Sequence, residues 1–426
     1  MSTISELRPP KAAAGAVVVL VATLATIYMV SQLLRNSIGV IAPDLAQEVG
    51  LSASQIGILS SAFFFAFAAA QLPLGVAIDR YGPKRCMVVC AVVVIAGALV
   101  FAAAATPAGL LAGRILMGLG TSCYLMAPLA LYARRFAADR FATFAGWQMG
   151  MGSIGTLLAT APLALSAAAV GWRTTFVGMA VVMGIALVLV ALVVRENGDT
   201  GAASVRQESF WQSLAGIRAA CATDSVGLLF LAHMTAYSSF VLIAGLWGGP
   251  YLSHVYGLGL TERGTLLLVP AITQVVGMVI WGRAGRLFGS YKAPVLIGAG
   301  TTCALLWFLA LAGQRPLPAL IATLAVFGFF AGYTPLVVAH GKSLFPPHLV
   351  GRGMTLLNMG SMGGVFVSQT VTGWAIDLFP AEAGAYPLAS YQLVFALQAA
   401  CLLATCIAYL WARDPSVHRR EGATVK

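Results

Sequence analysis

The chain has 426 residues, of which 59% are hydrophobic and 9% are charged, and it carries a formal net charge of +11. Charged residues make up about a quarter of a typical soluble chain, so this composition excludes a soluble enzyme and a soluble nucleic-acid-binding domain. The seven cysteines fall mostly in apolar runs without metal-ligand spacing, and their odd number argues against a disulfide framework. We therefore expect an integral membrane protein that needs no metal or cofactor.

Apolar segments long enough to cross a bilayer, about 20 residues each, follow one another along the whole chain. The first is too long for the apolar part of a signal peptide. A polar connection, 195–223, divides the chain into two halves, 1–194 and 224–426, and its residues 210–220 are typical of a short interfacial helix. The twelve predicted spans are 16–42, 53–77, 86–105, 108–133, 142–168, 174–194, 225–249, 262–284, 293–312, 317–340, 354–377 and 390–411.

The distribution of basic residues predicts the orientation. With the N-terminus inside, most of the 25 lysines and arginines fall in cytoplasmic segments, whereas the outer loops carry only Arg173, Arg263 and Arg315. This asymmetry predicts an inner-membrane protein with both termini and the 195–223 linker in the cytoplasm. Because the charge is spread over many loops, it does not indicate a nucleic-acid partner.

A short charged turn, residues 75–85 (GVAIDRYGPKR), connects the second and third spans. Gly75 would let another helix approach closely. Gly82 supplies the backbone freedom of a tight reversal, and Pro83 restarts the chain with a fixed φ. Asp79 can face the N-terminus of a neighbouring helix, where a negative charge is favourable. The candidate gating residues of this turn are Gly75, Asp79, Arg80, Gly82, Lys84 and Arg85.

This turn resembles the signature loop of the major facilitator superfamily, Gly-x-x-x-Asp-Arg-x-Gly-x-Lys/Arg-Arg, which lies between its second and third helices. The resemblance covers essentially the whole chain, and residues 282–289 echo the motif in the second half with Arg286 in the acidic position. It implies an all-α membrane fold of twelve transmembrane helices in two pseudo-symmetric six-helix bundles around a central cavity. It also implies transport by alternating access, in which the bundles rock.

The fourth span carries residues 113–120 (GRILMGLG), which resemble the superfamily pattern Arg-x-x-x-Gly-x-Gly. Its glycines, Gly118 among them, would allow close packing against the first helix. Arg114 could bond exposed carbonyls there. We expect a structural or conformational role for Arg114, with direct substrate contact as the alternative.

Arg35 is the most informative residue of the first span. A charge inside a span is costly and marks a functional site by default, and no carboxylate precedes Asp44 in this span. Residues 35–43 resemble the first helix of organophosphate:phosphate and related organic-anion transporters, where an arginine at about this position binds the substrate anion. Those antiporters carry a second arginine in the seventh helix, where this chain has His233 and Tyr237. The difference favours a carboxylate over a phosphate. Alternatively, Arg35 extends to the outer interface.

Other polar side chains inside the spans either line the cavity or bond between helices. His233, on the same helix face as Tyr237, is either a hydrogen-bonded structural histidine or a group that titrates near neutral pH. His340 is expected at the interface, and Trp147 and Gln369 are further in-span candidates. Besides Arg35, the candidate substrate-binding residues are Tyr28, Gln32, Tyr124, Gln148, His233, Tyr237, Gln274, Tyr333 and Asn358.

The 14 acidic residues all fall at span ends or in loops. Proton-driven drug exporters of the superfamily usually present a buried carboxylate and a Gly-Pro step in the fifth helix, which residues 150–162 lack. We therefore predict a monomeric secondary transporter of a small carboxylate-type organic anion, surrounded by lipid, with the proton as a candidate coupling ion. The alternatives are a multidrug or metabolite exporter of the same fold and a transporter-like sensor. No nucleophile–base pair indicates an enzyme.

Overall fold

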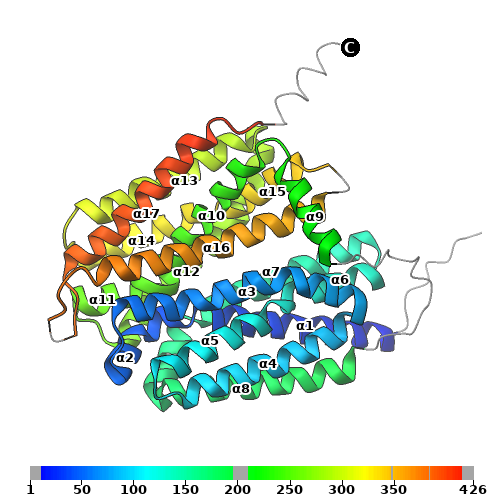
Figure 1. Cartoon of the computed structure of the whole chain (residues 1–426), viewed down its shortest axis with the longest axis horizontal. Helices are drawn as coiled ribbons and strands as arrows, with labels where there is room; N and C mark the ends of the chain where they lie inside the picture. Colours follow the sequence, from blue (N-terminus) through cyan, green and yellow to red (C-terminus); the bar gives the residue numbers. More distant parts are fainter. Residues whose placement is uncertain (1–10, 195–209, 347–348, 383, 415–426) are drawn as a thin grey trace, which may run out of the picture.

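The structure is a computed structural model that describes residues 11–194, 210–346, 349–382 and 384–414. Its described residues form helices joined by short turns, with one isolated bridge between Glu382 and Ala385. Figure 1 shows helices α1–α8 together on one side and α10–α17 together on the other. We call these groups the N-terminal half and the C-terminal half.

In the N-terminal half, two of the spans are each built from two consecutive helices. Its helices are α1 (Lys11–Asn36), α2 (Ile38–Val49), α3 (Ala53–Tyr81), α4 (Pro83–Ala103), α5 (Pro107–Thr121), α6 (Cys123–Arg135), α7 (Ala138–Leu158) and α8 (Ala161–Val193). The first span comprises α1 and α2, and the fourth comprises α5 and α6. Helix α8 continues from the fifth span into the sixth through Gly171, whose φ of 80° marks the reversal.

The C-terminal half repeats this plan after the short helix α9 (Phe210–Cys221), which lies where a helix was predicted. Its elements are α10 (Val226–Leu242), the π-helix η1 (Ile243–Trp247), α11 (Gly248–Tyr256), α12 (Leu260–Phe288), α13 (Lys292–Leu311), α14 (Leu317–Ala331), α15 (Thr334–Leu344), α16 (Val350–Ile376) and α17 (Leu388–Tyr409). The seventh span runs through α10, η1 and α11, and the tenth through α14 and α15.

The prediction of an all-α membrane fold with twelve spans is confirmed. Ten helical segments of the described chain are long and apolar enough to cross a membrane. The other two spans contain α7 and α16, which are less apolar because glycine, serine and threonine interrupt their apolar residues. Small residues of this kind are typical of helix faces that pack closely inside membranes.

Several details differ from the sequence-based expectations. The first span breaks at Ser37 and the seventh contains a π-helix, whereas both were predicted as continuous. Gly118 packs on the backbone of Phe63 in the second span, not against the first helix. His340, which was expected at the membrane interface, is fully buried inside the protein, and its ring nitrogens bond the Tyr409 hydroxyl and the Arg413 carbonyl. These bonds hold the end of α17 against α15.

Candidate functional site

The two halves touch most closely at one end of the molecule, which we call the sealed end; α2 and α11 mark it in Figure 1. A Cβ atom added to Gly39 of α2 would lie 2.6 Å from the carbonyl oxygen of Ala244 in η1. A Cβ added to Gly57 of α3 would lie 2.5 Å from the carbonyl oxygen of Gln369 in α16. Only glycine permits such backbone crossings.

Two charged contacts join the halves at the sealed end. Arg263 of α12 forms an ion pair with Asp44 of α2 and also donates from Nε to the Val40 carbonyl oxygen at 2.9 Å. The carboxylate of Asp377, which follows α16, accepts bonds from the backbone N–H groups of Ala53 at 3.0 Å and Ser54 at 2.9 Å. Asp377 thus caps the N-terminus of α3 from the opposite half, where the helix dipole favours a negative charge.

The electrostatics of Asp377 fit this capping role. Burial raises the pKa of its carboxyl group, but hydrogen bonds from Ser54 and Tyr386 lower the pKa more, so that the net pKa lies below its usual range. The Tyr386 hydroxyl donates to the Asp377 carboxylate at 2.8 Å. The carboxylate is therefore charged at neutral pH.

The charged turn after α3 lies at the other end, which we call the signature end. Asp79 pairs with Arg134 of α6 at 3.5 Å, and both side chains are about half exposed. Asp79 was expected to face a helix N-terminus, but its partner in this conformation is the last turn of a helix from its own half. A Cβ added to Gly75 would meet no atom within 4 Å. Gly75 therefore makes no close helix contact in this conformation.

The remaining residues of the turn fix its local geometry. Gly82 adopts a φ of 84°, in the region that favours glycine, and ends α3 directly before Pro83 begins α4. The Lys84 ammonium donates to the Ala191 carbonyl oxygen near the end of α8 at 2.7 Å. Arg80 lies over the ring of Tyr81 at 5.3 Å, and Arg85 is exposed.

Helices α3 and α16, one from each half, are in contact near the sealed end and not near the signature end. Starting from the Asp377 cap, the contacts between these helices include a hydrogen bond from Thr370 to Ser61 at 2.9 Å and a ring contact of Phe65 with Phe366 at 5.2 Å. Nearer the signature end each helix contacts its own half: Gln71 of α3 donates to the Ser122 carbonyl oxygen of the fourth span. The two helices thus pack together from the sealed end to about their middle.

Arg35 lies in the last turn of α1, just before the break at Ser37. Its side chain is only 6% exposed, and its guanidinium carbon lies 4.4 Å from the ring centre of Phe67. Among the described residues its Nε–H has no hydrogen-bond partner and its charge has no acidic partner. Tyr28, two turns earlier, lies within electrostatic range of both Arg35 and Tyr237. A buried guanidinium that lacks a carboxylate can attract an anion.

Arg114 differs from Arg35 because its donors are used within the protein. Its guanidinium is fully buried and donates to the Leu34 carbonyl oxygen at 2.8 Å. It also makes longer bonds, of 3.4 to 3.5 Å, to the carbonyl oxygens of Leu59, Ser60 and Arg35. These carbonyls belong to α3 and to the broken end of α1. Arg114 therefore satisfies backbone groups that the break exposes.

Other predicted residues also bond between helices. Gln148 donates to the carbonyl oxygens of Leu24 at 3.0 Å and Tyr124 at 3.1 Å, and it accepts from the Tyr132 hydroxyl. His233 Nδ1 lies 2.8 Å from the Leu357 carbonyl oxygen, which links α10 to α16. These contacts tie helices of the same half together.

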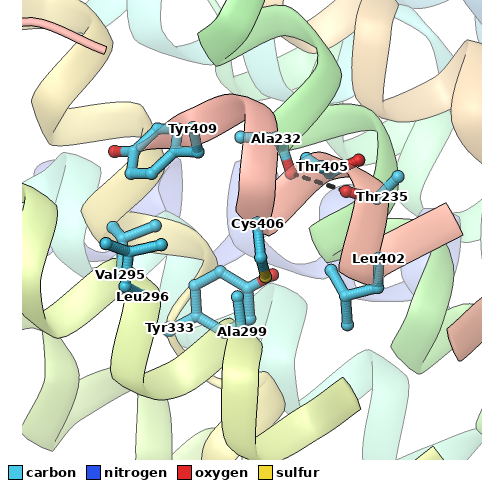
Figure 2. Close-up of a pocket in the computed structure, with 10 residues that line it drawn as sticks. All are labelled: Ala232, Thr235, Val295, Leu296, Ala299, Tyr333, Leu402, Thr405, Cys406 and Tyr409. Atoms are coloured by element: carbon cyan, nitrogen blue, oxygen red, sulfur yellow. Dashed lines mark hydrogen bonds between the residues drawn. The ribbon is translucent and has the colours of Figure 1, made fainter. Parts of the chain in front are cut away.

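The remaining candidate substrate-binding residues differ in their burial and in their hydrogen-bond partners. The Oε1 atom of Gln32 and the hydroxyl of Tyr124 are buried without a partner among the described residues, as is typical of positions that bind a ligand or water. Gln274 is buried, whereas Tyr237 and Asn358 are partly exposed. Tyr333 lines a separate cavity within the C-terminal half, together with Cys406 and other residues of α10, α13 and α17 (Figure 2).

The cavity beside Tyr333 is too small for a substrate. Its volume is about 10 Å³, which at most accommodates one water molecule. Figure 2 shows its lining of aliphatic and aromatic side chains, with the Thr235 hydroxyl bonded to the Ala232 carbonyl oxygen. We therefore regard this cavity as a packing gap between helices.

The fold and the charged turn agree with a comparison to protein families. The sequence model of the Major Facilitator Superfamily matches residues 24–246 and 228–425. The chain belongs to this superfamily. A solved nucleoside transporter of the superfamily fold has a TM-score of 0.75 at 15% identity, covering 92% of this chain and 99% of that one. The chain is thus a multi-pass membrane transporter.

Two curated proteins illustrate the range of sequences to which this chain is similar. The chain is 24% identical over 403 residues to the hexuronate transporter of Bacillus subtilis (strain 168), with 86% of this chain and 90% of that protein covered. It is 26% identical over 258 residues to a multidrug resistance protein of Shigella dysenteriae, with 60% of this chain and 63% of that protein covered. The similarity to the anion transporter therefore extends over more of both chains.

Sequence reasoning missed three elements of this transporter. Phe67, which covers the Arg35 guanidinium, looks like any apolar residue of a span. The cap by Asp377 joins residues far apart in the chain, although an acid directly after a span was a signal that it could reach a helix end. The glycine crossings were hidden because the chain contains 46 glycines, and the sequence does not show which of them lie where the two halves cross.

Proposed function

We propose that this transporter moves a small carboxylate-type organic anion across the inner membrane, with Arg35 as the main electrostatic contact of the anion. The observation that carries the proposal is the buried Arg35 guanidinium without an acidic partner among the described residues. Burying an unpaired charge is costly, and a bound anion would neutralise it. A guanidinium offers paired donors that match both carboxylate oxygens.

The proposed mechanism is alternating access by the halves 1–194 and 224–426, linked by 195–223. The conformation described here, sealed at one end, corresponds to one of the two states. We propose that the sealed end faces outward, since the basic residues at the signature end favour the cytoplasm. The signature turn, with Asp79 at its centre, would then form its contacts with the C-terminal half in the opposite state.

A second candidate function is export of lipophilic drugs, which the similarity to a multidrug resistance protein supports. Drug–proton exchange would need a titratable group to carry the proton. His233, in the seventh span, is a candidate for this group. In a proton-coupled transporter of either substrate class, His233→Gln should flatten the pH profile of transport. For the anion transporter without proton coupling, the profile should stay unchanged.

Direct binding measurements test the main proposal. The purified protein should bind hydroxylated and unsubstituted small carboxylates, measured by thermal shift and calorimetry, and should not bind lipophilic cations. Arg35→Ala should weaken carboxylate binding by about 10- to 100-fold, as expected for the loss of charge-assisted hydrogen bonds. Arg35→Lys should retain part of the affinity, because an ammonium keeps the charge but not the paired donors. Wild-type affinity in Arg35→Ala would contradict the proposal.

A further inference from the structure

Gln369 of α16 is the most unusual buried polar residue of the C-terminal half. Its side chain is fully buried, and among the described residues neither its amide nitrogen nor its amide oxygen has a hydrogen-bond partner. A buried polar group without a partner costs stability. An amide with both atoms unpaired is therefore expected where a ligand supplies the missing bonds.

A second glutamine shows that the fold can satisfy such a residue. Gln398 of α17 is also buried, and it accepts from the Ser368 hydroxyl at 2.7 Å. Its amide nitrogen donates to the hydroxyls of Ser238 at 3.1 Å and Ser239 at 2.9 Å. Gln398 therefore has a structural role, and it provides a matched control for Gln369.

Gln369 lies at the same level along the helix bundle as Arg35. Arg114 donates to carbonyl oxygens of both Arg35 and Ser60, which places those turns of α1 and α3 side by side. Thr370, the neighbour of Gln369, bonds to Ser61 of α3 at 2.9 Å. One turn of α16 is thereby level with the end of α1.

The side chains of Gln369 and Arg35 also lean in the same direction. Helical side chains tilt toward the N-terminus of their helix, and both α1 and α16 begin at the signature end. The contact of Arg35 with Phe67, two turns from Ser60 toward that end, agrees with this tilt. Ser60, whose hydroxyl likewise lacks a partner among the described residues, lies on α3 at this level.

We propose that Gln369 contacts the transported anion and recognises a hydroxyl group on it. The inference rests on the proposed function, because Arg35 supplies the contact for the carboxylate. A side-chain amide presents an NH2 group with two donors and a carbonyl oxygen that accepts, and a hydroxyl beside a carboxylate can both accept and donate. Gln369 would thus be the contribution of the C-terminal half to a site whose charge comes from the N-terminal half. The substrate class it selects is a hydroxylated carboxylate.

The test is the near-isosteric variant Gln369→Met in the full-length protein, compared with Gln398→Met. Transport of glycerate and tartrate, which carry hydroxyls, is measured against propionate and succinate, which lack them. Gln369→Met should raise KM for the hydroxylated acids by about 3- to 10-fold, the loss of a neutral hydrogen bond, and leave KM for the unsubstituted acids unchanged. Gln398→Met should lower Tm without changing this preference.

The outcomes distinguish a failure of the Gln369 assignment from a failure of the proposed anion transport. An unchanged preference in Gln369→Met, with wild-type carboxylate binding intact, would overturn the role of Gln369 alone and leave it a buried residue that water satisfies. Equal losses for both kinds of acid would also overturn it, because they would indicate a general effect on the site. Absence of any carboxylate binding by the wild type would overturn the proposed function together with this assignment. Gln369→Leu, measured in parallel, repeats the test with a different apolar side chain.

Discussion

The sealed end and the signature end hold the two halves in different ways. At the sealed end, backbones cross at Gly39 and Gly57, and Asp377 reaches across to cap α3. At the signature end, Gly75 has open space beside it and Asp79 bonds within its own half. The present conformation is therefore stabilised mainly by close packing at the sealed end, since half-exposed ion pairs contribute little.

This difference bears on the equilibrium between the state described here and the opposite state, in which the signature end would be closed. Each end combines a glycine at a helix face with an acid near a helix terminus, but only one end has its partners engaged. Helices α3 and α16 run antiparallel, and in this state Asp377 lies at the N-terminus of α3. If the signature end closes as proposed, Asp79 would approach the N-terminus of α16 in the same way. Engaging one acid requires releasing the other, and a difference of a few kcal/mol between the ends would decide which state is populated.

The largest loss of transport is expected when a large side chain replaces a glycine at the sealed end. Gly39→Leu should abolish transport, because its side chain would collide with the η1 backbone 2.6 Å from the position of Cβ. The measurement is substrate uptake at matched surface level. Gly300→Leu in α13, where a Cβ would meet no atom within 4 Å, is the control and should transport normally. Normal uptake by Gly39→Leu would show that the crossing is not needed for the seal.

Charge reversal in the signature turn should have the next largest effect. Asp79→Lys should leave the protein inserted and its Tm nearly unchanged, because the pair with Arg134 is half exposed in this state. Transport should nearly disappear, because the carboxylate is needed when the signature end closes. Arg134→Gln separates this explanation from a simple role of the ion pair, since it should retain most of the transport. Equal loss in both variants would favour the ion pair.

A smaller effect is expected at the Asp377 cap. Asp377→Asn keeps the size but removes the charge, which should weaken the seal by about 3- to 10-fold in population. A cysteine at Ala46, which lines a cavity of about 90 Å³ between the halves, should then react faster with a soluble maleimide. Asp224→Asn, which removes a pair with Arg413 within the C-terminal half, should not change this rate. An unchanged rate in Asp377→Asn would argue against a locking role.

Much of the fold follows from the sequence because spans are long, apolar and separated by charged turns. The signature turn alone places α3, α4 and their reversal at Gly82. The break at Ser37 was not predicted, because nothing in the apolar pattern of the first span marks it, although Arg114 was expected to bond carbonyls of this helix and does so at Leu34. The proposed anion contact at Arg35 could be predicted because a charge stands out in an apolar segment. The unpaired state of Gln369 could not, because it depends on which hydroxyls lie nearby.

The glycine crossings have a consequence for the surrounding bilayer. A seal formed by bare backbones lets the two halves approach each other closely around Gly39 and Gly57. If the halves rock as proposed, opening this end widens the protein there and narrows it in the opposite leaflet. The change of state then does work against the lateral pressure of the lipids. The shape of the lipid molecules in each leaflet would therefore shift the equilibrium between the two states, without any contact to the substrate.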